Sequence, residues 1–514
     1  MLTAALLLLL VLLALAVLGG RRGACGGGGL SALPGPWALP LVGGLPPMLH
    51  PELPLHLLEL ARRYGPVYRL RFGAKDVVVL NSVDSIRQAL TQKWSDFAGR
   101  PSSFVADLIS LGGHDLSLGD FTPGWRLQRK VAHSALARAQ RLQLDPVLGA
   151  QAAALCQVFR SYGGAAVDVA QDFSLQTCRT ICAMAFGPMM PDAAATRDIH
   201  DCITDLVALW GRGAVRALDA LPLLRVFPSG ALRRLLRQVR FRDAFVRAQI
   251  QRHQESLRPE CARDMVDHML QLLQDRRGAG GGGDPTAEGG LTPEHVHMAL
   301  VDLFIGGTET TAALLTWAVA FLLHHPQVQD GIHAELQRVL GPERPPSYGD
   351  RDRLPLLSAT ISETLRLRPV APLALPHRTT RDTSLLGFSI PKGTTVIPNL
   401  FAAHHDKGTW SHPLEFRPER FLEADDPRLA QRNLLPFSCG ARACLGETLA
   451  RAEIFVFLGH VLREFRLEPP APGALPSLRG LYGTVGLYGT VVRWPPFRVR
   501  VLPRGPLPEP PVTP

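Results

Sequence analysis

The fold of this chain is decided by ten consecutive residues near its C-terminal end: Phe437-Ser438-Cys439-Gly440-Ala441-Arg442-Ala443-Cys444-Leu445-Gly446. Gly440 permits a sharp turn ahead of Cys444, because glycine adopts backbone conformations that side chains exclude. Gly446 lets the helix expected after it approach a flat ligand closely. A glycine-rich loop around an ordinary buried cysteine is the alternative interpretation. The complete spacing Phe-x-x-Gly-x-Arg-x-Cys-x-Gly argues against it.

This spacing indicates a cysteine ligand for a haem iron. Such a thiolate needs an accessible sulfur, backbone N–H groups directed at it and small residues beside the porphyrin. Phe437 would shield the sulfur from water, and Arg442 would form a charge-assisted bond with a haem propionate. Cys444 is therefore the predicted metal ligand. Cys439 lacks this framing and is predicted to be structural.

A second motif, Glu363-Thr364-Leu365-Arg366, places Glu363 and Arg366 on one helix face. With residues 437–446 it makes the chain resemble the cytochrome P-450 family. That resemblance implies a mainly α fold with small β-sheets, a single domain and haem b as the cofactor. It also implies that Glu363, Arg366 and Arg420 form a buried triad supporting the haem loop. Taken alone, Glu363 and Arg366 would be read as a surface helix pair.

The resemblance also assigns further haem contacts. Thr122 and Pro123 predict a helix start, with a capping hydroxyl followed by proline. Trp125 and Arg129 are four positions apart, so both lie on one face of that helix. By resemblance they reach a haem propionate, and so do two residues elsewhere in the chain, Arg100 and His377.

Residues 306–311 resemble the stretch that activates oxygen in this family. They lie in the middle of a long helix predicted from Thr292-Pro293 to His325. Two adjacent glycines there cost up to about 2 kcal/mol relative to alanine, so a bend or a ligand approach is expected. Bound oxygen must receive protons before its O–O bond breaks. Thr310 would position water and donate, and Glu309 would relay protons from solvent.

Longer strings resemble one branch of the family, the vertebrate steroid 21-hydroxylases, over residues 51–505. They include residues 76–82, 96–101, 115–120 and 372–380. The resemblance implies hydroxylation of progesterone and 17-hydroxyprogesterone at carbon 21. Another steroid or xenobiotic hydroxylase of the same fold is the alternative. A non-catalytic haem carrier or sensor is a third possibility, although it would have no need of the Glu309–Thr310 pair.

Four residues are assigned to the steroid by this resemblance. Arg242 would donate to the steroid 3-ketone, since a buried carbonyl oxygen needs a donor. Asp302, one turn before Gly306, is expected to face the pocket. Ser117 is also assigned to substrate binding. Ala371 stands where a valine is expected, and its smaller side chain would let the steroid shift.

The first residues predict a membrane anchor. Leu2–Leu18 carries no charge and is followed by Arg21 and Arg22. About 20 apolar residues cross a bilayer, and flanking arginines favour the cytosolic side. A cleaved signal peptide is the alternative. The expected organisation is an anchor (1–20), a Gly/Pro-rich linker (21–50), the haem-thiolate monooxygenase domain (51–505) and a disordered tail (506–514).

Charge and missing motifs indicate the partners. The net charge is +10, without a compact basic block, which favours membrane lipid and an acidic protein partner over nucleic acid. The sequence shows no flavin, Rossmann or iron–sulfur signature, so electrons must come from outside. An anchored, cytosol-facing member of the family would use the NADPH-dependent diflavin reductase of the endoplasmic reticulum membrane.

Overall fold

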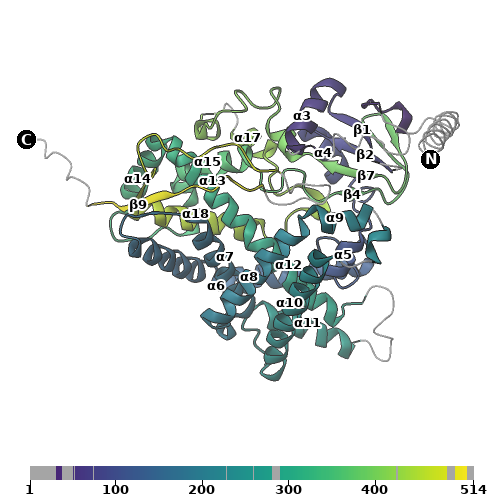
Figure 1. Cartoon of the computed structure of the whole chain (residues 1–514). Coiled ribbons are helices and arrows are strands. Elements are labelled where there is room, and N and C mark those ends of the chain that lie inside the picture. Colours follow the sequence, from purple (N-terminus) through teal and green to yellow (C-terminus); the bar gives the residue numbers. More distant parts are fainter. Residues whose placement is uncertain are drawn as a thin grey trace, which may run out of the picture.

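The computed structural model describes residues 30–37, 50, 52–72, 75–220, 222–226, 229–258, 260–279, 290–423, 427–482 and 492–505. The predicted anchor, most of the linker and the predicted tail lie outside these residues. Figure 1 shows a small β region beside a larger helical mass. This agrees with the predicted mainly α fold.

The main sheet has the strand order β1-β2-β7-β4. It joins β1 (Val67–Phe72) and β2 (Lys75–Leu80) to two strands from much later in the chain, β7 (Thr395–Pro398) and β4 (His377–Arg378). β2 and β7 run parallel, and the other pairs are antiparallel. Helix α3 (Leu53–Tyr64) lies beside this sheet (Figure 1).

The predicted long helix is two helices in the structure, α12 (Pro293–Gly307) and α13 (Glu309–His324). The break at Thr308 follows the glycine pair, so the predicted bend is confirmed. Among the described residues, Pro293–His324 is the one helical run long and apolar enough to cross a membrane. Because 67% of its most apolar window is buried inside the protein, it is a core helix.

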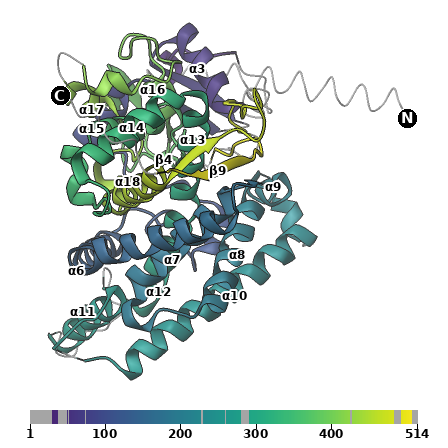
Figure 2. The ribbon, with the colours of Figure 1, turned by 90° about the vertical axis from the view of Figure 1, so that its left-hand side faces the viewer.

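Three long helices surround α13. They are α7 (Ala170–Phe186), α15 (Pro355–Leu367) and α18 (Glu447–Glu464). α6 (Pro123–Ser161) packs on α7 and α18, and begins at the Thr122 cap that the sequence predicted. In Figure 2 the helices of the middle of the chain occupy the lower half, and the sheet and later helices the upper half.

The remaining elements complete these two parts. They are α4 (Val83–Arg87), α5 (Phe104–Ile109), α8 (Ala193–Trp210), α9 (Gly213–Ala220), α10 (Gly230–Glu255), α11 (Met265–Ala279), α14 (Pro326–Leu340), α16 (Leu400–His404), α17 (Pro427–Asn433), β3 (Ala166–Val167), β5 (Thr383–Leu385), β6 (Phe388–Ile390), β8 (Phe465–Glu468) and β9 (Val499–Pro503), with short 3-10 turns and one π-helical turn at Gln88–Gln92.

Candidate active site

The loop before α18 holds Cys444 in a fixed position. Gly440 has φ +76°, and a Cβ added there would lie 1.6 Å from the carbonyl oxygen of Leu90. Only glycine fits that approach. The backbone N–H of Cys444 donates to the carbonyl of Phe437 at 3.0 Å, which closes the loop. The sharp turn predicted at Gly440 is therefore present.

Cys444 opens onto a cavity of about 310 Å³. Cys444 is exposed to this cavity. The surrounding protein nevertheless keeps its thiol away from bulk water, and this burial raises the pKa of the thiol. The N–H of Gly446 and the charge of Arg129 act in the opposite direction and favour the thiolate. The cavity brings together most of the predicted residues: Arg100, Ser117, Arg129, Asp302, Thr310, Ala371, His377, Arg442 and Cys444.

The arginines of this cavity form a buried cationic cluster. Burial, together with the charge of Arg100, lowers the pKa of Arg442 to about 8. Burial, with a smaller effect of the charge of Arg129, lowers the pKa of Arg100 to about 10. Buried charges are stable only when paired. A haem fits this site, because its propionates supply the missing anions and its iron a partner for the cysteine sulfur.

Three backbone carbonyls hold Arg442 in place. Its guanidinium donates to the carbonyls of Ala98, Leu116 and Gly119, at 2.9, 3.1 and 2.9 Å. Arginine has five N–H donors, so two are left for a propionate. Trp125 does not line the cavity. Its ring lies 3.8 Å from the Arg442 guanidinium carbon, and its indole N–H donates to Leu116.

His377 lines the cavity as a neutral side chain. Burial, and then the charge of Arg100, hold its pKa well below the usual value. Its Nδ1 lies 2.7 Å from the carbonyl of Phe97 and donates to it, so Nε2 carries a lone pair. The predicted bond to a propionate therefore requires protonation of Nε2, which the negative charge of a propionate would favour.

The predicted triad under the haem loop is present. Glu363 bonds Arg366 through both carboxylate oxygens, at 2.8 Å each, and Arg420 at 2.9 Å. Arg366 also donates to the carbonyls of His404, Pro413 and Glu415. Glu363 and Arg366 are fully buried. The triad thus ties α15 to the segment before the haem loop.

The two glycines at the end of α12 have different roles. A Cβ on Gly306 would meet no atom within 4 Å, and this residue lines the cavity. A Cβ on Gly307 would lie 2.4 Å from the side chain of Ile181. Gly306 therefore leaves space for ligands, as expected, whereas Gly307 allows α7 to approach. Thr310 faces the cavity, and its hydroxyl donates to the carbonyl of Gly306 at 2.6 Å.

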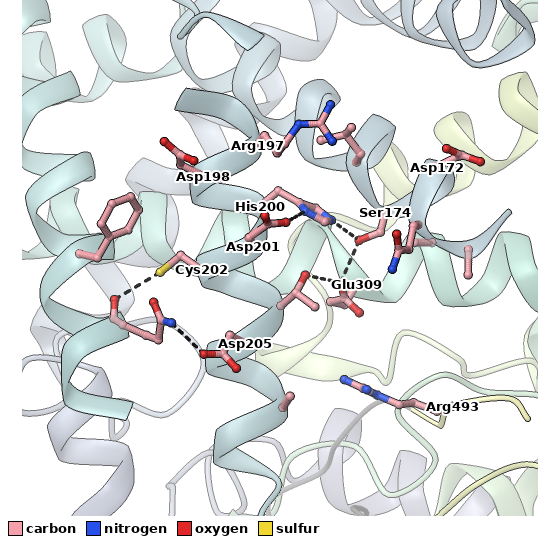
Figure 3. Close-up of a pocket in the computed structure, with 18 of the residues that line it drawn as sticks. Asp172, Ser174, Arg197, Asp198, His200, Asp201, Cys202, Asp205, Glu309 and Arg493 are labelled. Atoms are coloured by element: carbon pink, nitrogen blue, oxygen red, sulfur yellow. Dashed lines mark hydrogen bonds and ion pairs between the residues drawn. The ribbon is translucent and has the colours of Figure 1, made fainter. Parts of the chain in front are cut away.

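Glu309 lies outside this cavity. It lines a second, open cleft of about 1150 Å³ between α7, α8 and α13 (Figure 3). Its Oε1 accepts hydrogen bonds from Ser174 at 2.8 Å and Thr204 at 2.9 Å. Sequence reasoning missed both hydroxyls. They lie 135 and 105 residues away in the chain, so no local pattern could have linked them to Glu309.

The predicted substrate residues fall into two groups. Asp302 accepts bonds from the Ser117 hydroxyl and the N–H of Leu116, both at 2.6 Å. Burial, with a smaller effect of Asp115, raises the pKa of Asp302 to about 8. Arg242 does not line the cavity. It is fully buried, and its Nε and Nη2 bond Asp243, while its Nη1 has no partner among the described residues.

The model of the family "Cytochrome P450" matches residues 33–485. The chain belongs to the cytochrome P450 family. This finding confirms the predicted fold, the haem cofactor and the class of haem-thiolate monooxygenase.

Individual cytochromes P450 are also similar over most of the chain. It is 47% identical to bovine steroid 21-hydroxylase over 93% of its length and 95% of the bovine chain. It is 45% identical to human steroid 21-hydroxylase over 91% of its length and 92% of the human chain. A zebrafish cytochrome P450 solved with progesterone superposes with a TM-score of 0.76 and 33% identity, covering 88% of this chain and 99% of that one.

Proposed function

We propose that this cytochrome P450 hydroxylates progesterone and 17-hydroxyprogesterone at carbon 21. The observation that carries the proposal is the similarity of this chain to steroid 21-hydroxylases of several mammals, which extends over nine-tenths of the chain. When bound, the haem supplies the activation of O₂. The chain's own residues hold the haem, orient the steroid and deliver protons.

Haem binding is assigned to two sets of residues. Cys444 is the iron ligand. The propionates are held by Arg100, Arg129 and Arg442, and by His377 once its Nε2 is protonated. Trp125 acts through Arg442, because its ring packs against that guanidinium. Thr310, which lines the same cavity, would hold a proton-donating water there, and Glu309 would supply that water with protons.

Arg242 is proposed to bind the steroid 3-ketone through Nη1. An unpaired buried donor costs about 1–3 kcal/mol, and a ketone oxygen would remove that cost. Asp243 accepts from two other nitrogens of Arg242 and from His297, so the guanidinium is held in one orientation. Ser117 and Asp302 contact the steroid from the cavity wall. Ala371 leaves it more room than a valine would.

The remaining proposals concern the surroundings of the enzyme. Residues 1–20 anchor it in the endoplasmic reticulum membrane, and residues 51–505 form the catalytic domain, which faces the cytosol. Electrons come from an NADPH-dependent diflavin reductase. The net charge of +10 suits an acidic docking face and an anionic membrane surface.

The test compares two steroids that differ at carbon 3, progesterone with a ketone and pregnenolone with a hydroxyl. We expect wild type to bind progesterone more tightly. Arg242→Gln should reduce that preference by about tenfold or more, since a hydrogen bond to a charged group contributes about 1.5–3 kcal/mol. Arg247→Gln, on the exposed side of the same helix, is the control. An unchanged preference in Arg242→Gln would contradict the assigned contact.

Ala371 favours a second outcome, hydroxylation at an additional carbon, because it lines the cavity with no bulk to restrain the steroid. Ala371→Val should then narrow the product distribution. If the products are the same in both proteins, Ala371 has no role in regioselectivity.

A further inference from the structure

The second cleft contains an unbroken line of hydrogen bonds that ends on Glu309. Oδ1 of Asp201 lies 2.8 Å from Nδ1 of His200, and Nε2 of His200 lies 2.8 Å from Oγ of Ser174. Oγ of Ser174 lies 2.8 Å from Oε1 of Glu309. Figure 3 shows these side chains pointing toward one another from α8, α7 and α13. Three steps thus connect one carboxylate to another through an imidazole and a hydroxyl.

The two ends of this line differ in their access to water. The side chain of Asp201 is 70% exposed, whereas that of His200 is 11% exposed. Ser174 is buried. Glu309 begins α13 at the break after Thr308, and its neighbour Thr310 lines the haem cavity. The line therefore runs from solvent to the residue that precedes the cavity hydroxyl.

The donors and acceptors along this line of hydrogen bonds allow two arrangements of its protons. Ser174 has one hydroxyl proton. If Ser174 donates to an ionised Glu309, then Nε2 of His200 must donate to Ser174, and Nδ1 donates to Asp201. His200 is then doubly protonated. If Glu309 is protonated and donates to Ser174, the serine turns its proton toward Nε2, and His200 is neutral. These states differ by one proton moved from His200 to Glu309.

We propose that His200 and Ser174 form a proton relay that conducts solvent protons from the mouth of the cleft at Asp201 to Glu309. This rests on the proposed monooxygenase function, which consumes protons in the haem cavity. Each transfer moves the Nε2 proton of His200 through Ser174 to Glu309. The imidazole ring then turns over, so that its remaining N–H faces Ser174 and its free nitrogen takes a proton from water beside Asp201. Glu309, whose carboxylate rests in the second cleft, then swings toward Thr310 and passes its proton to the water held there. The net charge of the relay is unchanged after each cycle.

Other charged groups facing His200 set its environment but lie outside this line. They are Arg197, Asp198 and Asp205 on α8, Asp172 on α7, Arg234 on α10 and Arg493 near the C-terminal end. Asp205 is engaged by Arg234 and Gln238. Thr204 provides the sharpest comparison. It donates to the same Oε1 of Glu309 as Ser174 does, but within the described part of the chain its side chain makes no hydrogen bond to the imidazole of His200.

The experiment uses the full-length holoenzyme with reductase and NADPH. It measures coupling, meaning all hydroxylated steroid per NADPH oxidised, whichever carbon is attacked. Ser174→Ala and His200→Gln should lower coupling by about tenfold, with a larger solvent deuterium isotope effect and a changed pH profile. Ser174→Thr should restore coupling, because it restores the hydroxyl. Thr204→Val, which removes an equal hydrogen bond from Glu309, should keep coupling within about twofold of wild type.

A second readout does not depend on turnover. In protein labelled with ¹⁵N-histidine, the His200 ring signals are identified by their loss in His200→Gln. In Glu309→Gln they should shift, because the hydrogen-bonded line that includes His200 then ends on an amide, which cannot take up its proton. Asp172→Asn should leave them nearer to wild type. Equal coupling in Ser174→Ala and Thr204→Val, or His200 signals unaffected by Glu309→Gln, would overturn the relay. A different hydroxylated product would overturn only the proposed substrate chemistry.

Discussion

Replacing Glu363 by glutamine should destabilise the haem-binding half of the protein strongly. The change keeps the side-chain volume but removes the negative charge that pairs with Arg366 and Arg420. Glu363 accepts four hydrogen bonds, three from these arginines and one from the N–H of Arg417 at 2.9 Å. Removing one partner of a buried ion pair costs about 3–5 kcal/mol, because the other charge stays buried. Two arginines lose their counter-ion here, so the upper part of that range is expected.

The assay is urea unfolding of the holoprotein, followed by circular dichroism and by loss of the haem absorbance. Haem release makes the transition more than two-state, so midpoints are compared rather than extrapolated free energies. Glu468→Gln is the control. Glu468 pairs with Arg466 at 3.4 Å with both side chains substantially exposed, and such pairs contribute at most about 1 kcal/mol. Similar midpoints for Glu363→Gln and Glu468→Gln would refute a structural role for the triad.

Three further predictions follow from the site. Gly307→Ala should destabilise the fold by about 1–3 kcal/mol through its overlap with Ile181, whereas Gly306→Ala should keep stability but weaken steroid binding. Thermal unfolding measures the first effect and steroid-binding spectra the second. Equal effects of the two variants would contradict the different roles assigned to the two glycines. Cys444→Ser should abolish the reduced-CO absorbance typical of a thiolate-bound haem, and Cys439→Ser should retain it. The pKa of Asp302 is about 8 in the folded protein and about 4 in the unfolded chain. Between these pH values the folded state therefore binds more protons than the unfolded state, so its stability falls as pH rises. Asp302→Asn should flatten that decline in unfolding measured from pH 5 to 8; an unchanged slope would mean that Asp302 is ionised in the folded protein.

Sequence reasoning succeeded where the chemistry lies within a few consecutive residues. Cys444 and Gly440 belong to one loop, and Glu363 and Arg366 to one helical turn, so their spacing predicted which side chains lie together. The bend between α12 and α13 was predictable for the same reason. Two adjacent glycines in the middle of a helix are unfavourable, so Gly306 and Gly307 predicted a bend there. That Glu363 and Arg366 are buried was implied only by the family resemblance.

The remaining features depend on contacts between distant segments. Gly307 is needed because Ile181 of α7 approaches it, and nothing near residue 307 encodes that approach. Glu309 turns away from the haem cavity because Ser174 and Thr204 bind its carboxylate from α7 and α8. Trp125 was expected at a propionate, but its indole N–H bonds Leu116 and its ring supports Arg442. Tertiary packing decided each of these cases.

The most direct test of the account is turnover of progesterone by the purified protein with reductase and NADPH, with products identified by mass spectrometry after a reduced-CO spectrum. We expect the spectrum of a thiolate-bound haem and 21-hydroxyprogesterone as the main product. A thiolate spectrum with another main product would contradict the proposed substrate chemistry. Folded, haem-loaded protein without the thiolate spectrum would contradict Cys444 as the iron ligand.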